Sequence, residues 1–377
     1  MRVFRLFFGW IYKKIIKPLL FRLSPDDAHN YLISVAKVWQ RIPGLRQLTR
    51  VLLAYRYDDR LRQKIAGIDF SNPVGISAGF DKNIELQPTI HMIGCGFETG
   101  GSITRYPRRG NDRPWFHRLP KTKSLVVHAG LANDGLDEIT SIVERDKAVQ
   151  NKMPLIISVA VAACDSKCTI SQSIEEACDA LLAIQNKKLA QAVEVNISCP
   201  NAQDGQPFTQ PKNLETLMVA IGRLKLELPI FVKMPNKQTW SEFEPILDIV
   251  AKHNIQGVTI SNLVKDRETV NLKDELPDDI KGGLSGKPTS NRSNLLIRET
   301  YRKYGDKLVI IGVGGIFSAE DAYEKIKNGA SLVALITGMI FEGPQLVGDI
   351  NNGLARLARS EGYDNISQAV GSIQSAD

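Results

Sequence analysis

The sequence predicts an α/β fold, a closed (β/α)8 TIM barrel that carries an N-terminal amphipathic helical extension. Between about residues 65 and 360, short apolar runs alternate with stretches of helical periodicity, which is typical of β/α units and a parallel sheet. Eight such runs occur, and most connections between them are long enough for a helix, which favours a closed barrel over an open sheet. A barrel needs roughly 250 residues, so the 377-residue chain has an N-terminal segment left over.

The chain divides near residue 60 into two predicted parts. Residues 1–60 form the helical segment, and residues 61–377 form the barrel domain. The eight predicted strands are Val74–Ser77, Phe97–Gly100, Leu155–Val161, Ala192–Ile197, Ile230–Met234, Gly257–Ser261, Leu308–Ile311 and Leu332–Leu335.

The positive charge of the chain is concentrated at its beginning. The formal net charge is +7, and residues 1–22 contain six lysines and arginines without one acidic residue, so the remainder is nearly neutral. Nucleic-acid binders usually carry a basic face across the folded domain, so we expect no nucleic acid as partner. The six cations are Arg2, Arg5, Lys13, Lys14, Lys17 and Arg22.

Aromatic and aliphatic residues alternate with these cations. The longest uncharged run, Leu6–Tyr12, is far shorter than the roughly 20 residues that span a bilayer, and no signal-peptide cleavage site follows it. An amphipathic helix of this composition is expected to lie in the interface of an anionic membrane. We therefore predict a peripheral protein on the cytoplasmic face of the inner cell membrane. The alternative is that these helices only pack on the barrel.

A second N-terminal helix is predicted after a short break. Ser24 is a cap, Pro25 occupies the first helical position, and Asp26 and Asp27 place acids in the first turn. We expect Pro43-Gly44 to end this helix. Among the five cysteines, Cys164 and Cys168 are separated by three residues, but no second pair or histidine accompanies them, so we expect no metal site.

Polar residues follow the predicted strands at the end where barrel enzymes place their chemistry. Lys82 and Ser102 follow the first two strands, Asn196 and Cys199 lie at the fourth, Lys233 lies in the fifth, and Asn262 follows the sixth. Gly314-Gly315 after the seventh strand and Thr337-Gly338 after the eighth indicate a site for a phosphorylated ligand. The glycines do not form the G-x-G-x-x-G pattern of a dinucleotide fold.

At these residues the sequence resembles the dihydroorotate dehydrogenases. The N-terminal helical pair is similar to that of the class 2 members, which are membrane-associated and pass electrons to a quinone. The matching stretches are NPVGISAGFDKN (72–83), GNDRPWFHRLP (110–120), VNISCPN (195–201), FVKM (231–234), GGLSGKP (282–288), VIIGVGGI (309–316) and NGASLVALITGMIFEGP (328–344).

The resemblance implies an FMN enzyme that oxidises dihydroorotate to orotate in de novo pyrimidine biosynthesis. Residues 1–60 would provide membrane association and quinone access, Cys199 would be the catalytic base, and Lys233 would stabilise the reduced flavin. The implied substrate ligands are Lys82, His128, Asn133, Asn196, Asn201 and Asn262. The implied FMN ligands are Ala78, Gly79, Lys82, Ser102, Ser158, Asn196, Lys233, Ser261, Gly286, Gly314, Gly315, Thr337 and Gly338.

Several positions depart from the family pattern. At the position of Cys199, class 2 members have serine. Class 1 members have cysteine there, as this chain does. An asparagine that contacts substrate is replaced by Val127 or, with a one-residue gap, by His128. Ser158 and Leu263 also replace more polar family residues, Ile336 replaces a tyrosine, and Ser71 replaces a basic residue near the quinone tunnel. Two alternatives stay open: an FMN barrel acting on another dihydropyrimidine or cyclic enoate, and a catalytically silent membrane-bound flavin-binding protein.

Overall fold

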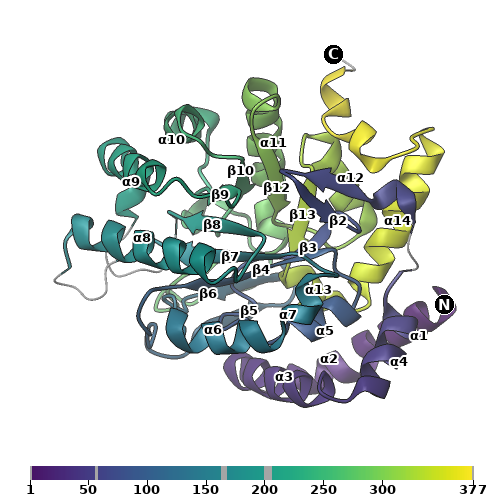
Figure 1. Cartoon of the computed structure of the whole chain (residues 1–377). Helices are drawn as coiled ribbons and strands as arrows, with labels where there is room; N and C mark the ends of the chain where they lie inside the picture. The colour runs from purple at the N-terminus through teal and green to yellow at the C-terminus, as the bar shows by residue number, and fades with distance from the viewer. Residues whose placement is uncertain (1, 56–57, 163–167, 199–205, 376–377) are drawn as a thin grey trace.

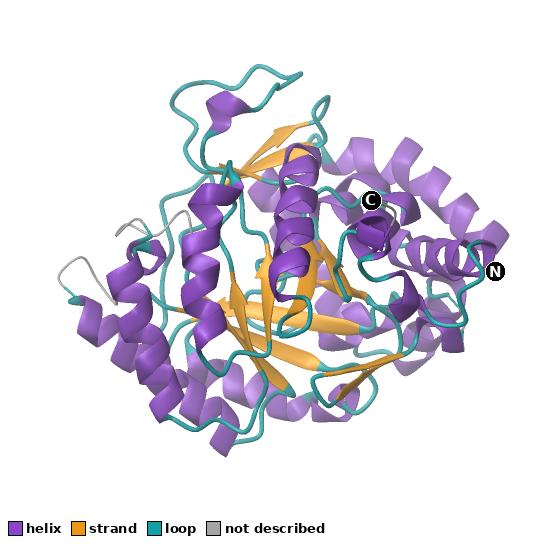
Figure 2. Ribbon diagram, turned by 90° about the horizontal axis from the view of Figure 1, so that it is seen from above, coloured by secondary structure: helices purple, strands orange, loops and turns teal. Residues whose placement is uncertain are grey.

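A computed structural model describes residues 2–55, 58–162, 168–198 and 206–375. All eight predicted strands are confirmed, and they form one closed barrel of parallel strands in the order β10-β12-β13-β3-β4-β7-β8-β9. Figures 1 and 2 show the strands at the centre of a ring of helices. The strands are β3 (Val74–Ile76), β4 (Phe97–Ile103), β7 (Leu155–Ala160), β8 (Ala192–Asn196), β9 (Ile230–Lys233), β10 (Gly257–Ile260), β12 (Val309–Val313) and β13 (Leu332–Leu335).

The surrounding helices bury one apolar face each, and local caps fix where several of them begin. Thr169 and Gln172 form a capping box at the start of α8, and Thr239 and Glu242 form another at α10. The helices of the barrel domain are α5 (Gln87–Met92), α6 (Leu136–Arg145), α7 (Lys147–Gln150), α8 (Ile170–Asn186), α9 (Pro211–Arg223), α10 (Trp240–Lys252), α11 (Ser290–Tyr304), α12 (Ala319–Lys327), α13 (Thr337–Glu342) and α14 (Leu346–Ser360).

An antiparallel hairpin closes the amino-terminal end of the barrel. Its strands are β1 (Gln63–Ile65) and β2 (Ile68–Phe70). Phe70 is fully buried and packs edge-on against Phe97 at the start of β4, with ring centroids 5.7 Å apart. Because this end is filled by side chains, a ligand can enter the barrel only from the carboxyl ends of the strands.

The N-terminal extension is helical throughout, as predicted, but it contains more helices than expected. It consists of α1 (Arg2–Ile11), a π-helical turn (Tyr12–Ile16), α2 (Lys17–Leu20), α3 (Pro25–Trp39) and α4 (Pro43–Leu53). Ser24 caps α3 as predicted, by accepting a hydrogen bond from the Asp27 amide. The prediction that Pro43-Gly44 ends a helix is wrong, because Pro43 begins α4. Proline suits the first helical position, since the backbone N–H that it lacks has no partner within the first turn.

A small sheet that the sequence did not predict covers part of the barrel mouth. It contains β5 (Phe116–Leu119), β6 (Ser124–Val127) and β11 (Gly283–Leu284), paired antiparallel. The buried carboxylate of Asp26 in α3 accepts hydrogen bonds from the amides of Trp115 (3.1 Å) and Phe116 (3.3 Å). The first helical turn of α3 is thereby fastened to this sheet, and α3 is held over the mouth.

Candidate active site

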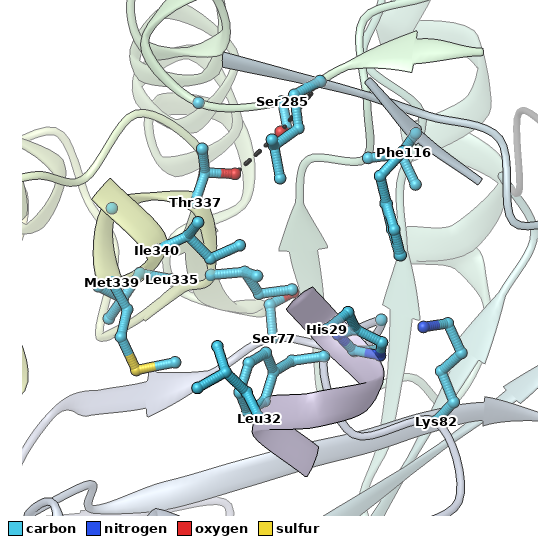
Figure 3. A pocket seen from close by; sticks show the side chains of 18 of the residues that line it. His29, Leu32, Ser77, Lys82, Phe116, Ser285, Leu335, Thr337, Met339 and Ile340 are labelled. Atoms are coloured by element: carbon cyan, nitrogen blue, oxygen red, sulfur yellow. Dashed lines mark hydrogen bonds between the residues drawn. The ribbon is translucent and has the colours of Figure 1, made fainter. Parts of the chain in front are cut away.

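One cavity of about 550 Å³ joins the barrel mouth to the N-terminal helices. At the barrel end it is lined by strand-end residues such as Asn196, Lys233 and Gly314. At the other end it passes between apolar side chains of the extension, among them Leu20 and Leu32. Figure 3 shows Leu32 and His29 of α3 facing the same space as the side chains at the ends of the strands. The cavity therefore connects a polar chamber with the surface of the helical extension.

A chain of buried hydrogen bonds fixes the polar chamber from below. Asn196 Nδ2 donates to Ser102 Oγ at 2.8 Å, and Ser102 Oγ lies 2.8 Å from Ser158 Oγ. Ser158 in turn donates to the buried carboxylate of Glu194 at 2.8 Å, and Thr259 donates to its other oxygen at 2.6 Å. Such a satisfied network holds Asn196 in one orientation. Ser158 belongs to the floor of the site and does not line the cavity.

Lys233 and Asn262 are positioned by the loop that follows β8. Lys233 is 5% exposed, and its Nζ lies 3.4 Å from the carbonyl oxygen of Ala78. Ser198 Oγ donates to the Lys233 carbonyl at 2.8 Å, and Asn262 Nδ2 donates to the Ser198 carbonyl at 2.8 Å. Three strand ends are thus tied together where β8, β9 and β10 open into the cavity.

Lys82 presents a buried ammonium that lacks a hydrogen-bond partner among the described residues. Its Nζ lies 5.2 Å from the ring centroid of Phe116 and 5.7 Å from that of Trp115. Burial is the main cause that lowers the pKa of Lys82 to about 8; the charges of Asp81 and Asp26 oppose the decrease, and that of Arg113 adds to it. An unpaired ammonium in such surroundings favours an anionic ligand, which would supply the missing partner.

The Lys82 ammonium points toward His29, as Figure 3 shows. Burial together with the charges of Lys82 and Arg113 lowers the pKa of His29 to about 3. The imidazole is therefore neutral at physiological pH. Lys82 then provides the positive charge on this wall, and His29 contributes only a polar, uncharged surface.

Glycines form a concave floor beside the ends of β12 and β13. An added Cβ at Gly314 would lie 2.4 Å from Thr289 Oγ1, and one at Gly338 would lie 1.9 Å from the Ile316 carbonyl, so only glycine fits. The parallel pairing of Val313 with Ala334 directs the Gly314 amide toward β13, whereas the Gly315 amide has no acceptor among the described residues. Thr337 Oγ1 donates to Ser285 Oγ at 2.8 Å, which Figure 3 marks with a dashed line. This glycine floor has room and a free backbone donor, the Gly315 amide, for an anion.

The helix that follows this floor is already capped by the protein. Ser318 Oγ accepts from the Asp321 amide at 3.1 Å, and the Asp321 carboxylate accepts from the Phe317 amide at 2.8 Å. The start of α12 therefore carries the Asp321 carboxylate in place of an anionic ligand. The free backbone donor lies earlier in the chain, at Gly315.

The cavity gathers most of the residues that the sequence singled out. Cys199 and Asn201 lie outside the described residues. Asn133 uses its side chain within its own loop: Oδ1 accepts from the amides of Thr104 and Gly135, and Nδ2 donates to Thr104 Oγ1. The predicted residues that line the cavity are Ala78, Gly79, Lys82, Ser102, Asn196, Lys233, Ser261, Asn262, Gly286, Gly314, Gly315, Thr337 and Gly338.

Val127, and not His128, is the residue that β6 turns toward the cavity. The His128 ring lies 3.1 Å from Asn111 Nδ2, and its amide donates to the Trp115 carbonyl at 2.7 Å. Leu263 and Ile336 also line the cavity. Ser71 lies elsewhere, on a separate cavity of about 100 Å³ beside α4 and α5.

Two wall residues, His29 and Arg118, were not predicted from the sequence. Arg118 lies in β5 and donates to the carbonyls of Leu23 (2.8 Å) and Phe21 (3.3 Å), and its guanidinium lies 4.5 Å from the Phe21 ring centroid. Both positions depend on how α3 and the small sheet meet. That contact joins segments about 90 residues apart, and no local pattern indicates it.

The fold and the site define a (β/α)8-barrel enzyme whose chemistry takes place at the carboxyl ends of the strands. More narrowly, the chain belongs to the dihydroorotate dehydrogenase family, whose model matches residues 60–357. The resemblance noted from the sequence motifs is thereby confirmed.

Curated relatives extend the match over nearly the whole chain. Proteins named dihydroorotate dehydrogenase (quinone) from Deinococcus deserti and Gloeobacter violaceus are 33% and 34% identical to it. These alignments cover 96% and 95% of this chain, and 99% and 98% of the relatives. A ligand-free dihydroorotate dehydrogenase from Eimeria tenella superimposes with a TM-score of 0.80 at 25% identity, covering 93% of this chain and 99% of that one.

Proposed function

We propose that this protein oxidises dihydroorotate to orotate with bound FMN and passes the electrons to a membrane quinone, in pyrimidine biosynthesis. The observation that carries the proposal is the cavity that joins the barrel mouth to the N-terminal helices. One end offers Lys82, Asn196 and Lys233 to a polar anionic substrate, and the other end opens between apolar helices. The curated relatives bear the name of this quinone-linked activity.

The residues present fit a flavin mononucleotide. The free amide of Gly315, with Gly286, Gly314 and Gly338 beside it in the cavity lining, suits the phosphate. Lys233 is buried where its charge would stabilise an electron-rich ring. When bound, FMN supplies the two-electron chemistry that links substrate oxidation to quinone reduction.

The chain's own residues would bind and orient the substrate. Lys82 would pair with the carboxylate, which relieves the desolvation of its ammonium. Asn196, held by its network, and Asn262 would donate to the ring amide groups. The small sheet and helix α3, which are tied together over the barrel mouth, would shield the chamber from water. Cys199, which follows Ser198 in the sequence, is our choice for the base that removes the C5 proton, because a cysteine thiol ionises at moderate pH.

The helical extension would place the cavity opening on a membrane. Among the described residues, sixteen of the eighteen exposed large apolar side chains lie between Val3 and Val51. Leu32 and Val35 belong both to this apolar surface and to the cavity lining. No helix among the described residues is long and apolar enough to cross a bilayer. We infer peripheral attachment of this surface to an anionic membrane, from which a quinone enters the cavity.

Not all of the N-terminal cations are available for lipid. Arg5 is 2% exposed and pairs with Asp349 at 3.0 Å, and Lys17 donates to the Phe341 carbonyl at 3.1 Å. Lys14 and Arg22 are exposed. The apolar surface therefore carries more of the proposed membrane affinity than the count of six cations suggested.

A second candidate function is oxidation or reduction of another cyclic amide or enoate by the same FMN site. Val127 and Leu263 favour it, because they bring apolar side chains to the chamber wall. Losing a hydrogen bond to a buried polar group of the substrate costs about 1–3 kcal/mol. The remaining polar wall of Lys82, Asn196 and Asn262 makes dihydroorotate the first choice.

The decisive experiment is anaerobic mixing of the purified flavoprotein with dihydroorotate while the visible flavin absorbance is followed. We expect rapid bleaching that a soluble quinone reverses. If FMN is bound and dihydroorotate leaves it oxidised, the second candidate replaces the first, and other dihydropyrimidines become the substrates to try.

A further inference from the structure

One face of helix α3 lies against the barrel domain and carries a buried polar residue at each end. Asp26 and Gln40 are 14 residues apart, which is close to four helical turns, so they share this face and lie about 21 Å from one another along the axis. Ile33, halfway between them, packs on the main hydrophobic core. The opposite face is exposed, as at Tyr31 and Val38. Polar side chains on a helix usually face water, so the burial of these two needs a reason.

At the start of α3, Asp26 fixes the aromatic wall beside Lys82. Its carboxylate accepts hydrogen bonds from the Trp115 amide, at 3.1 Å to each oxygen, and from the Phe116 amide at 3.3 Å. The ring centroids of these two residues lie 5.7 Å and 5.2 Å from the Lys82 ammonium. The charge of Asp26 also acts on that ammonium, because it opposes the decrease in the pKa of Lys82.

After the end of α3, Gln40 fixes the turn that carries the backbone of Lys82. Its Nε2 donates to the Glu85 carbonyl at 2.7 Å, and its Oε1 accepts from the amide (3.2 Å) and the hydroxyl (2.8 Å) of Thr89. An amide suits this place, because it donates at one end and accepts at the other. The Glu85 amide donates in turn to the Asp81 carboxylate at 2.9 Å. Since Asp81 precedes Lys82 in the chain, a continuous hydrogen-bonded path joins Gln40 to this turn.

The Lys82 ammonium has no hydrogen bond among the described residues, so the groups around it set where it lies. The charged and titratable groups that act on it are Asp81 on its own turn, Asp26 and His29 on α3, and Arg113 in the loop before β5. His29 is neutral, because its pKa is lowered to about 3. Of these groups, Asp26 is the carboxylate that α3 brings to Lys82 from a distant part of the chain.

We propose that helix α3 positions Lys82 for the substrate carboxylate: Asp26 holds the aromatic wall against the ammonium and supports its charge, and Gln40 holds the turn from which the side chain extends. Both are positioning residues, since neither lines the cavity. An ammonium that is already held in place need not be ordered when the substrate binds. The inference rests on the proposed role of Lys82. It adds that the helix proposed to face the membrane also sets the affinity for dihydroorotate.

Asp26→Asn tests the charge together with the wall. Flavin reduction in the full-length holoprotein is followed by anaerobic stopped-flow absorbance at several dihydroorotate concentrations, from pH 6.5 to 9.5. Removing the carboxylate charge favours the neutral amine, so the half-saturating concentration should begin to rise at lower pH than in the wild type, and should be about two- to fivefold higher at pH 8. The limiting rate should stay within twofold. Asp27→Asn, an exposed residue of the same helical turn, is the matched control and should leave the pH profile unchanged.

Gln40→Met removes both hydrogen-bonding ends of the side chain at a similar volume. We expect the half-saturating concentration of dihydroorotate to rise about 2- to 10-fold at pH 7, as for the loss of one net hydrogen bond. The limiting rate and the FMN occupancy should stay close to those of the wild type. Gln47→Met, an exposed position on α4, is the matched control and should change none of these values.

Three outcomes would overturn the inference. One is a pH profile of Asp26→Asn that coincides with that of the wild type. Another is a Gln40→Met protein that keeps the wild-type half-saturating concentration, whatever its thermal midpoint, which indicates a structural role alone. The third is a loss of FMN and of limiting rate in step with affinity in both variants, which indicates general loosening of the site. A wild-type flavin that dihydroorotate leaves oxidised, or a Lys82→Met protein with wild-type affinity, would contradict the proposed function and, with it, this inference.

Discussion

The two ends of the cavity are built in different ways. The barrel end consists of short strand termini tied by buried hydrogen bonds, such as the path from Asn196 through Ser102 to Ser158. The apolar end consists of helices laid on the barrel and tied to it by separate contacts, among them the Arg5–Asp349 pair, the bonds from Tyr12 and Lys17 to carbonyls of α13, and those that Asp26 accepts from the small sheet. Substrate chemistry needs fixed geometry, whereas quinone access needs only a continuous apolar path. The two functions are therefore separable by mutation.

The largest expected effect lies at the barrel end. Cys199→Ala should keep FMN bound but slow flavin reduction by dihydroorotate by about 10²–10⁴-fold, the range typical of a removed general base. Anaerobic stopped-flow absorbance measures this rate directly. Cys199→Ser, which introduces the hydroxyl that class 2 members have at this position, should retain part of the rate. Reduction at the wild-type rate in Cys199→Ala would eliminate Cys199 as the base.

Lys82→Met tests the buried ammonium. We expect the KM for dihydroorotate to rise roughly 10- to 100-fold, because a hydrogen bond to a charged group contributes about 1.5–3 kcal/mol. FMN occupancy, read from the absorbance of the purified protein, should stay close to that of the wild type. A KM that stays within twofold would place the substrate carboxylate elsewhere.

The same lysine predicts a pH dependence with a defined sign. The free-enzyme pKa of Lys82 is lowered to about 8, so the ammonium that binds the substrate anion is present below this pH and lost above it. The KM of the wild type should accordingly rise between pH 8 and 10, whereas that of Lys82→Met should stay flat. A parallel rise in both proteins would assign the dependence to another group.

The apolar end is tested by Phe7→Ser combined with Trp10→Ser. These rings stack with centroids 6.4 Å apart and are 59% and 53% exposed. Burying one large side chain contributes about 1.5–3 kcal/mol, so binding to anionic vesicles should weaken about 30-fold or more in a sedimentation assay. Reduction of a long-chain quinone in vesicles should fall with it, but flavin reduction by dihydroorotate should not.

Val219→Ser is the matched control for this pair. Val219 lies on α9, away from the extension, and is one of the few other exposed large apolar side chains among the described residues. It should leave vesicle binding intact. Equal losses in the control and the double variant would show that general surface hydrophobicity, and not this face, sets the membrane affinity.

The barrel could be predicted because its strands are continuous apolar runs ending in glycine or polar residues. The small sheet could not, because β6 has four residues and β11 two, too few for periodicity to show. For a related reason, the sequence did not show which of Val127 and His128 faces the cavity. Alternate residues of a strand face opposite sides, so a gap of one residue reverses the assignment.

In the helical segments, too, local sequence does not determine where a helix starts or which of its side chains are buried. Pro43 suits both the region after a helix and the first position of the next, and the sequence alone does not separate the two. Lys325 and Lys327 are both plain lysines in an amphipathic helix, but one is fully buried and the other pairs with Glu361. Which of them faces α11 depends on the rotation of α12 against the barrel, which tertiary packing sets.

The smallest expected effect, at Val127, distinguishes the two candidate substrates. If dihydroorotate is the substrate, Val127→Asn restores an amide where the family has one, and its KM should fall about 3- to 10-fold, since a net hydrogen bond contributes about 0.5–1.5 kcal/mol. If the natural substrate carries an apolar group at this wall, the same change buries an unsatisfied amide and raises the KM for that substrate. His128→Asn is the control, because the His128 side chain faces Asn111 outside the cavity, and it should change neither value. A lower KM for dihydroorotate in Val127→Asn would mean that this chain tolerates an apolar chamber wall for a polar substrate. A higher KM would mean that the wall was selected for a different ring.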